Sequence, residues 1–311
     1  MRLPIYTLKI VFLFLGIVSL LLLGTLAVLA QQKVTPEEWQ ALFNGKNLEG
    51  WDIKIAGHEL NDNYKNTFRF EDGMVRISYD EYQQFDNNYG HMYYQKPFSH
   101  YKLRFQYRFT GDQVPGGATW NVRNSGIMFH SQSAKSLTKN QEFPLSLEIQ
   151  LLGGLGTGPR TTGNVCTPGT MVQMAGRINP DHCINSNSKT YEGDRWVSVE
   201  AVVLGDSVVH HIVEGDTVLS YQKPQIGEVY WAQGKKDAYS DIWKDKNGML
   251  LKEGYIALQA ESHPIDFRQV EILNLKGCTD PAAKNYKSYY LASDNCNCEY
   301  SFWEKLKRLF K

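Results

Sequence analysis

Short runs in which apolar and polar residues alternate recur from residue 67 to residue 275 of this 311-residue chain. Successive side chains of a β-strand point to opposite faces, so each run predicts a strand with one buried face. Turn pairs such as Asp72-Gly73 and Gly205-Asp206 separate several runs, as in hairpins. The predicted strands are 67–70, 74–79, 101–110, 126–130, 145–151, 196–204, 207–213, 217–221, 254–261 and 265–275. The sequence therefore predicts an all-β domain of two packed antiparallel sheets, a β-sandwich.

The predicted sandwich occupies residues 40–275, and shorter segments flank it. Residues 31–39 form a linker, and residues 36–42 are expected to form a short helix. Residues 276–300 are interpreted as a small cysteine-containing module, and residues 301–311 as a basic amphipathic helix at the tail. Segments 152–195 and 224–250 are long Gly-, Asn- and Pro-rich connections without a strand pattern, and loops of that length are usually functional or disordered.

The N-terminal 30 residues have the features of an export signal. Arg2 and Lys9 precede an apolar run over residues 10–30, and the small-residue end at Ala30 resembles a cleavage site. We expect a cleaved signal peptide, with an uncleaved membrane anchor as the alternative, because the run is long enough to span a bilayer. In either case the body of the protein is exported to the periplasm, the medium or the cell surface, and only an uncleaved anchor would contact a membrane.

The cysteines and the charge fit this location. In an oxidising compartment, Cys166 is expected to pair with Cys183, and Cys278 with Cys298, which leaves Cys296 as the odd thiol. The formal net charge is zero, so the sequence gives no electrostatic reason to expect nucleic acid or an anionic membrane surface as a partner.

Candidate functional residues concentrate on the polar faces of three predicted strands. Gln259 and Glu261 share one parity of the run 254–261, and a turn at Pro264 follows. On strand 145–151, Glu148 and Gln150 share the parity opposite to the apolar residues. The remaining candidates are Asn124 before strand 126–130, His182 in a loop expected to wall the site, and His263 and Arg268 at its rim. A solvated, salt-bridged face is the simpler interpretation, but this mixture of amide, carboxylate, imidazole and guanidinium is more varied than such faces usually carry.

Several of these segments together resemble one known family. FNGKNLEGW at 43–51, NSGI at 124–127, LEIQLL at 147–152, TGNVCTPGT at 162–170 and GYIALQAESHPIDFR at 254–268 look like the 3-keto-disaccharide hydrolase domain family. The resemblance covers residues 40–275 and implies a concanavalin A-like jelly roll whose concave sheet forms a sugar-binding groove. It also implies that Glu148 and Gln150 match the family's polar strand pair. Gln259, Glu261 and His263 match the family segment in which Leu-Gln is followed by an acid or amide and then by His. Arg268 matches the family's FR dipeptide near the last strand.

By this resemblance the protein is an exported carbohydrate-active enzyme that cleaves glycosidic bonds of 3-keto-glycosides. Elimination after removal of the C2 proton would use His263 as base, Arg268 or a divalent cation on the enolate, and Glu148 or Glu261 as acid. Ordinary hydrolysis would instead use Glu148 and Glu261 as acid and nucleophile. We expect Asn124, Gln150, His182, Gln259 and Arg268 to bind substrate.

The alternative function is a non-catalytic, lectin-like module, for which aromatic rings and amides would suffice. Its acidic residues could hold Ca²⁺. In the enzyme, a metal held by His263 with Glu148 or Glu261 is compatible with the chemistry, although the sequence has no metal-ligand spacing. A carbohydrate is the expected partner in both cases.

Overall fold

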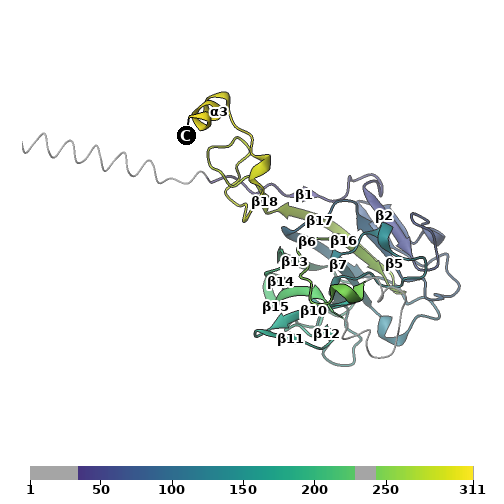
Figure 1. Cartoon of the computed structure of the whole chain (residues 1–311). Coiled ribbons are helices and arrows are strands. Elements are labelled where there is room, and N and C mark those ends of the chain that lie inside the picture. Colours follow the sequence, from purple (N-terminus) through teal and green to yellow (C-terminus); the bar gives the residue numbers. More distant parts are fainter. Residues whose placement is uncertain (1–33, 228–242, 311) are drawn as a thin grey trace, which may run out of the picture. The chain divides into compact units, whose positions relative to one another are not determined.

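The computed structural model describes residues 34–227 and 243–310, so the predicted signal or anchor and most of the predicted connection 224–250 lie outside the described residues. The described residues divide into two compact units, one within residues 38–276 and one of residues 34–37 with 277–310. The larger unit contains a ten-stranded and a seven-stranded antiparallel sheet (Figure 1). This confirms the predicted all-β sandwich.

The ten-stranded sheet has the order β11-β10-β15-β14-β13-β6-β17-β4-β3, and β1 also pairs with β17. The long strands β6 and β17 lie at its centre and pair in antiparallel register. Its strands are β1 (Gln40–Ala41), β3 (Phe68–Glu71), β4 (Met74–Ile77), β6 (His100–Phe109), β10 (Thr170–Met174), β11 (Arg177–Asn179), β13 (Val197–Leu204), β14 (Val208–Val213), β15 (Asp216–Ile226) and β17 (Ile265–Asn274).

The seven-stranded sheet has the order β12-β9-β8-β7-β16-β5-β2. Its strands are β2 (Trp51–Ile55), β5 (Gly90–Tyr94), β7 (Asn124–Ser131), β8 (Leu147–Leu152), β9 (Asn164–Cys166), β12 (Cys183–Ile184) and β16 (Tyr255–Ala260). Short 3₁₀ turns connect the strands at η1 (Tyr64–Asn66), η2 (Thr119–Asn121), η3 (Ala134–Ser136) and η5 (Lys244–Lys246). β7 and β16 are neighbours at the centre of this sheet, and β8 pairs with the other edge of β7.

The main core lies between the two sheets and follows the alternation of the sequence. In β6, every second residue from Tyr101 to Phe109 is buried, and the residues between them are partly exposed. Phe105 of β6 and Phe267 of β17 pack with ring centroids 6.2 Å apart. From the seven-stranded sheet, Ile127 and Ile149 belong to the same buried cluster. The period-two pattern therefore determines which face of each strand turns inward.

Two predictions about local structure are wrong. Residues 36–42 form no helix, because Gln40 and Ala41 pair with β17. The segment 152–195 is not a strandless connection, since it contains the short strands β9 to β12. β9, β11 and β12 have only two or three residues, which is too short for an alternating pattern to be recognised, whereas the five residues of β10 were overlooked.

The smaller unit and the cysteines agree with the sequence. Both predicted disulfides, Cys166–Cys183 and Cys278–Cys298, are present, and Cys296 is an exposed free thiol. The expected tail helix is α3 (Phe302–Leu309), with a Ser301 side chain that caps it by accepting from the Glu304 backbone N–H. The unit also contains η6 (Asn295–Asn297) and β19 (Ala292–Ser293), which pairs with β18 (Lys276–Gly277). Among the described residues, no helix has the length and apolar character that crossing a membrane requires.

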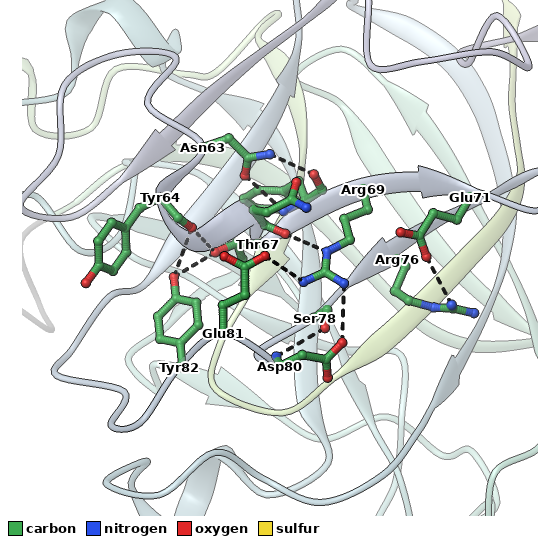
Figure 2. A network of polar contacts seen from close by, with 12 residues as sticks. Asn63, Tyr64, Thr67, Arg69, Glu71, Arg76, Ser78, Asp80, Glu81 and Tyr82 are labelled. Atoms are coloured by element: carbon green, nitrogen blue, oxygen red, sulfur yellow. Dashed lines mark hydrogen bonds and ion pairs between the residues drawn. The ribbon is translucent and has the colours of Figure 1, made fainter.

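A buried carboxylate joins three strands of the ten-stranded sheet. Asp266 of β17 is fully buried and accepts from Arg76 Nε at 3.0 Å and from Arg108 Nη2 at 2.9 Å. Arg76 also pairs with the half-exposed Glu71, and Figure 2 shows this pair beside the Arg69 network of the β3–β4 hairpin. The two cations compensate the charge that the sheet buries at Asp266.

Asp266→Asn is expected to lower the free energy of unfolding by about 1–3 kcal/mol, because it leaves two partly buried guanidiniums without their carboxylate. Glu71→Gln removes an exposed partner of Arg76 and should change stability by less than about 1 kcal/mol. Urea unfolding of both variants measures the difference. Equal losses would show that burial of Asp266 is not what makes its ion pairs matter.

Candidate active site

The candidate site lies on the face of the seven-stranded sheet that points away from the main core. Glu148 and Gln150 alternate with the core residues of β8, and Gln259 alternates with those of β16. β7 lies between these two strands and pairs Gly126 with Gln150. Side chains from β8 and β16 therefore approach each other across β7.

Gly126 allows this approach. A methyl group on Gly126 would lie 2.5 Å from Glu148 Oε1 and 2.6 Å from its Cγ, closer than side-chain atoms pack. The Glu148 carboxyl consequently occupies the space over Gly126 and reaches the Gln259 amide on β16. A residue without a side chain thus decides where the carboxyl is placed.

Burial changes the ionisation of the two glutamates. It raises the pKa of Glu148 to about 8, although the neighbouring Gln259 amide opposes the shift. Burial also raises the pKa of Glu261 well above its ordinary value, and the charge of Glu148 raises it further. Two carboxyl groups that repel each other in a dry environment cannot both ionise easily. The pair therefore retains at least one proton near neutral pH.

Several buried polar atoms near this pair are unsatisfied. They are Glu261 Oε2, Asn124 Oδ1, Asn121 Oδ1, His91 Nε2 and the Tyr93 hydroxyl, none of which has a hydrogen-bond partner among residues 34–227 and 243–310. Buried polar groups in proteins are nearly always hydrogen-bonded, so a cluster of exceptions needs an explanation. A ligand rich in hydroxyl groups would supply the missing partners.

An apolar patch covers the adjoining part of the same face. Tyr93, Met128 and Ala257 from three neighbouring strands pack against Ala134, and Leu137 and Phe143 complete the cover. Phe143 also contacts the rings of Tyr89 and His91, at 4.9 and 6.2 Å between centroids. The polar cluster formed by Asn124, Glu148, Gln259 and Glu261 thus has an aromatic border.

Five predicted site residues lie on this sheet face or at the end of its strands: Asn124, Glu148, Gln150, Gln259 and Glu261. Their roles remain predictions. Gln150 Oε1 accepts from Asn164 Nδ2 at 3.0 Å, which holds the Gln150 side chain toward β9. His182 lies next to the edge strand β12, where its backbone carbonyl accepts from Thr167, and burial lowers its pKa to about 4.

The expected position of Arg268 at the rim of this site is wrong. The turn after Glu261 carries the chain into β17, which belongs to the other sheet. Arg268 there donates to Gln106 Oε1 at 2.7 Å and stacks over Trp196 at 4.0 Å. A strand pattern cannot reveal that a turn changes sheets, which is why one continuous polar segment was assigned to one site.

His263 lies within this turn, in different surroundings from the two glutamates. Its ring packs at 77° on Phe109, with 5.5 Å between the centroids. Burial lowers the pKa of His263 to about 4, the positive charge of Arg123 contributes, and Asp112 and Asp194 oppose the shift. The imidazole is therefore neutral at physiological pH and is a weak base.

Sequence reasoning missed the residues that come from β5 and the loops. His91 and Tyr93 share one parity of a strand in which every residue is buried, so no polar face marks it. Burial lowers the pKa of His91 to about 3. The sequence signal for this strand is its run of aromatic and apolar residues, which favours a buried strand but does not indicate which face carries the site.

The divalent cation considered for the enolate has no evident set of ligands in the described part of the chain. No group of three or more His, Cys, Asp or Glu side chains there could hold a metal ion. Glu148 and Glu261 supply only two carboxyl groups. The charged groups that act on His263 are two arginines and two aspartates, and not these glutamates. The residues present do not fit a protein-held metal at this site.

Comparisons with known proteins agree with the sugar-related resemblance. The model of the 3-keto-alpha-glucoside-1,2-lyase-like domain matches residues 38–273. A solved Parabacteroides distasonis protein, provisionally described as a glycosyl hydrolase, shares 19% identity over 76% of this chain and 100% of its own, with a TM-score of 0.44. The carbohydrate-binding module CBM66 from Bacillus subtilis shares 9% identity over 72% of this chain and 96% of its own, with a TM-score of 0.40. No curated protein sequence matches the chain.

The raised pKa of Glu148 predicts a pH-dependent cost in stability. Between the ordinary value of 4.5 and about 8, the unfolded chain has lost a proton that the folded chain retains, so rising pH destabilises the fold. The Glu148→Gln variant cannot ionise at this position. The difference between its free energy of unfolding and that of wild type should therefore grow, in favour of the variant, by up to about 1.4 kcal/mol per pH unit in this window.

Urea unfolding at pH 5, 6.5 and 8 checks this expectation. Glu49→Gln, at an exposed carboxylate, is the matched control and should follow wild type at every pH. If the difference between Glu148→Gln and wild type is the same at pH 5 and pH 8, the pKa of Glu148 is not raised.

Proposed function

The chain belongs to the family of 3-keto-alpha-glucoside-1,2-lyase-like domains, and on that premise we propose that it cleaves the glycosidic bond of 3-keto-glycosides by elimination. The C3 ketone of such a sugar acidifies the proton on C2. A base removes that proton to give an enolate, the C1–O bond breaks, and the leaving oxygen takes a proton from an acid. Water then adds across the new double bond, with its hydroxyl on C1 and its proton on C2, so the net reaction is hydrolysis.

The observation that carries the proposal is the coupled pair of Glu148 and Glu261. Elimination needs one base with a pKa near the working pH and one acid that remains protonated. Burial raises the pKa of Glu148 to about 8, and burial together with the charge of Glu148 raises the pKa of Glu261 well above its ordinary value. We assign Glu148 as the base that removes the C2 proton and Glu261 as the acid that protonates the leaving group.

Gln259 is placed to stabilise the enolate. Its amide lies beside Glu148 and is fully buried. An N–H donor aimed at a developing negative charge in a dry site lowers the barrier to proton removal. This assignment replaces Arg268, which lies on the other sheet. The two disulfides support the proposed location outside the cytoplasm.

Glu148→Gln and Glu261→Gln are each expected to lower kcat on a 3-keto-glucoside at least a hundredfold, the usual effect of losing a general base or acid. His263→Ala should retain turnover within tenfold of wild type, because His263 is assigned no proton transfer. Wild-type kcat/KM should rise with pH toward about 8 as the base ionises. The measurement is product NMR with the 3-keto-glucoside and its unoxidised parent as substrates.

Two outcomes would overturn these assignments. Full activity of Glu148→Gln would remove Glu148 as the base, and a hundredfold loss in His263→Ala would restore His263 to that role. If wild type turns over neither sugar but binds them, the lectin-like alternative takes the place of the enzyme.

Gly126→Ala tests the placement of the base without touching its chemistry. The new methyl must push the Glu148 carboxyl away from Gln259, so kcat should fall at least tenfold. Circular dichroism and the melting temperature show whether the fold survives. Wild-type kcat in a folded Gly126→Ala protein would show that the position of Glu148 over Gly126 is not required.

A further inference from the structure

The indole of Trp120 stacks on Tyr89, which neighbours the proposed acid Glu261, and we propose that this indole is the stacking platform for the pyranose ring of the leaving-group sugar. The inference rests on the proposed function and names the part of the substrate that the protein recognises there. It implies that the preferred substrate is a 3-keto-disaccharide or longer sugar, and not a 3-keto-glucoside with a small alkyl group.

Trp120 combines exposure with a fixed orientation. Its side chain lies in η2 and is 54% exposed, which is unusual for so large an apolar group. The ring lies at 9° to that of the buried Tyr89, with 6.2 Å between centroids. Tyr89 is near enough to Glu261 for that carboxylate to help raise the tyrosine pKa. An open aromatic face is therefore held one ring away from the acid.

The loop that carries Trp120 is fastened to the chain directly after Glu261. Gln113 Nε2 donates to the Ala118 carbonyl at 2.8 Å and to Ser262 Oγ at 2.9 Å. The Val114 N–H donates to the Ser262 carbonyl at 3.0 Å. A side chain at Gly117 would lie 2.5 Å from both Gln113 Nε2 and Ser262 Oγ, so the loop packs directly on this segment. These contacts fix the platform relative to the acid.

Polar atoms for sugar hydroxyls border the platform. Asn121 Nδ2 donates to the Tyr89 hydroxyl at 3.1 Å, and Asn124 Nδ2 donates to the Trp120 carbonyl at 3.3 Å. The Oδ1 atoms of both asparagines are buried and lack partners among the described residues. Sugars offer an apolar C–H face to aromatic rings and hydroxyl groups around their edge. An exposed indole with unsatisfied amide oxygens beside it matches both requirements.

The position of Glu261 decides which sugar binds there. As the acid, Glu261 must face the oxygen that joins the two sugars, because that oxygen receives its proton. The keto-sugar lies on the side of Glu148 and Gln259, where the C2 proton is removed. Tyr89 neighbours Glu261 and Trp120 stacks on Tyr89, so we assign the ring that stacks on Trp120 as the one that leaves.

The test compares Trp120→Ala on a 3-keto-glucosyl-glucose and on methyl 3-keto-glucoside, whose leaving group cannot reach the platform. We expect kcat/KM for the disaccharide to fall at least tenfold, mainly through KM, and kcat/KM for the methyl glycoside to change less than threefold. Trp120→Phe should restore part of the loss. Trp303→Ala, at an exposed indole of α3, is the matched control and should behave as wild type on both substrates.

Each outcome decides between the proposals. An equal loss on both substrates would mean that Trp120 only supports the loop, and no loss on the disaccharide would remove the platform. If wild type turns over neither sugar, the proposed function fails, and calorimetric binding of the same two sugars tests the platform separately. Trp120→Ala must then weaken binding of the disaccharide at least tenfold and spare the methyl glycoside, or the platform fails too.

Discussion

The mutual repulsion of two buried carboxyl groups is the interaction on which the candidate site depends. Burial raises the pKa of both Glu148 and Glu261, and the charge of Glu148 raises the pKa of Glu261 further, with no cation among the described residues to oppose either shift. On the ten-stranded sheet, Asp266 instead lies between Arg76 and Arg108 of neighbouring strands, which neutralise its charge. The fold therefore compensates a buried carboxylate where it serves stability and leaves two of them uncompensated where chemistry is proposed.

The turn from Glu261 to Pro264 organises both the site and its surroundings. It ends the strand that carries Gln259, moves the chain into the opposite sheet and receives the loop that bears Trp120. Ser262 has a backbone φ of +72°, a conformation that residues other than glycine rarely adopt. Strain of this kind persists only where the surrounding contacts hold it, as the bonds to Ser262 do here.

Sequence patterns predicted the parts of the molecule that follow a simple period. The alternation in β6, β8 and β16 determines both the core and the face that carries Glu148 and Gln259. The misplaced residue, Arg268, follows a change of sheet, which depends on tertiary packing. β5 and Trp120 were missed for a different reason: a strand buried on both faces shows no polar side, and a lone exposed tryptophan in a loop has no pattern.

The ionisation of the pair is most directly measured by ¹³C NMR of protein labelled at the glutamate carboxyl carbons, with Glu148→Gln and Glu261→Gln used to assign the two signals. The account predicts that at pH 7 at least one of these carboxyls is protonated and that the first of the pair titrates near pH 8. Two signals that both titrate near the ordinary glutamate value of 4.5 would contradict it.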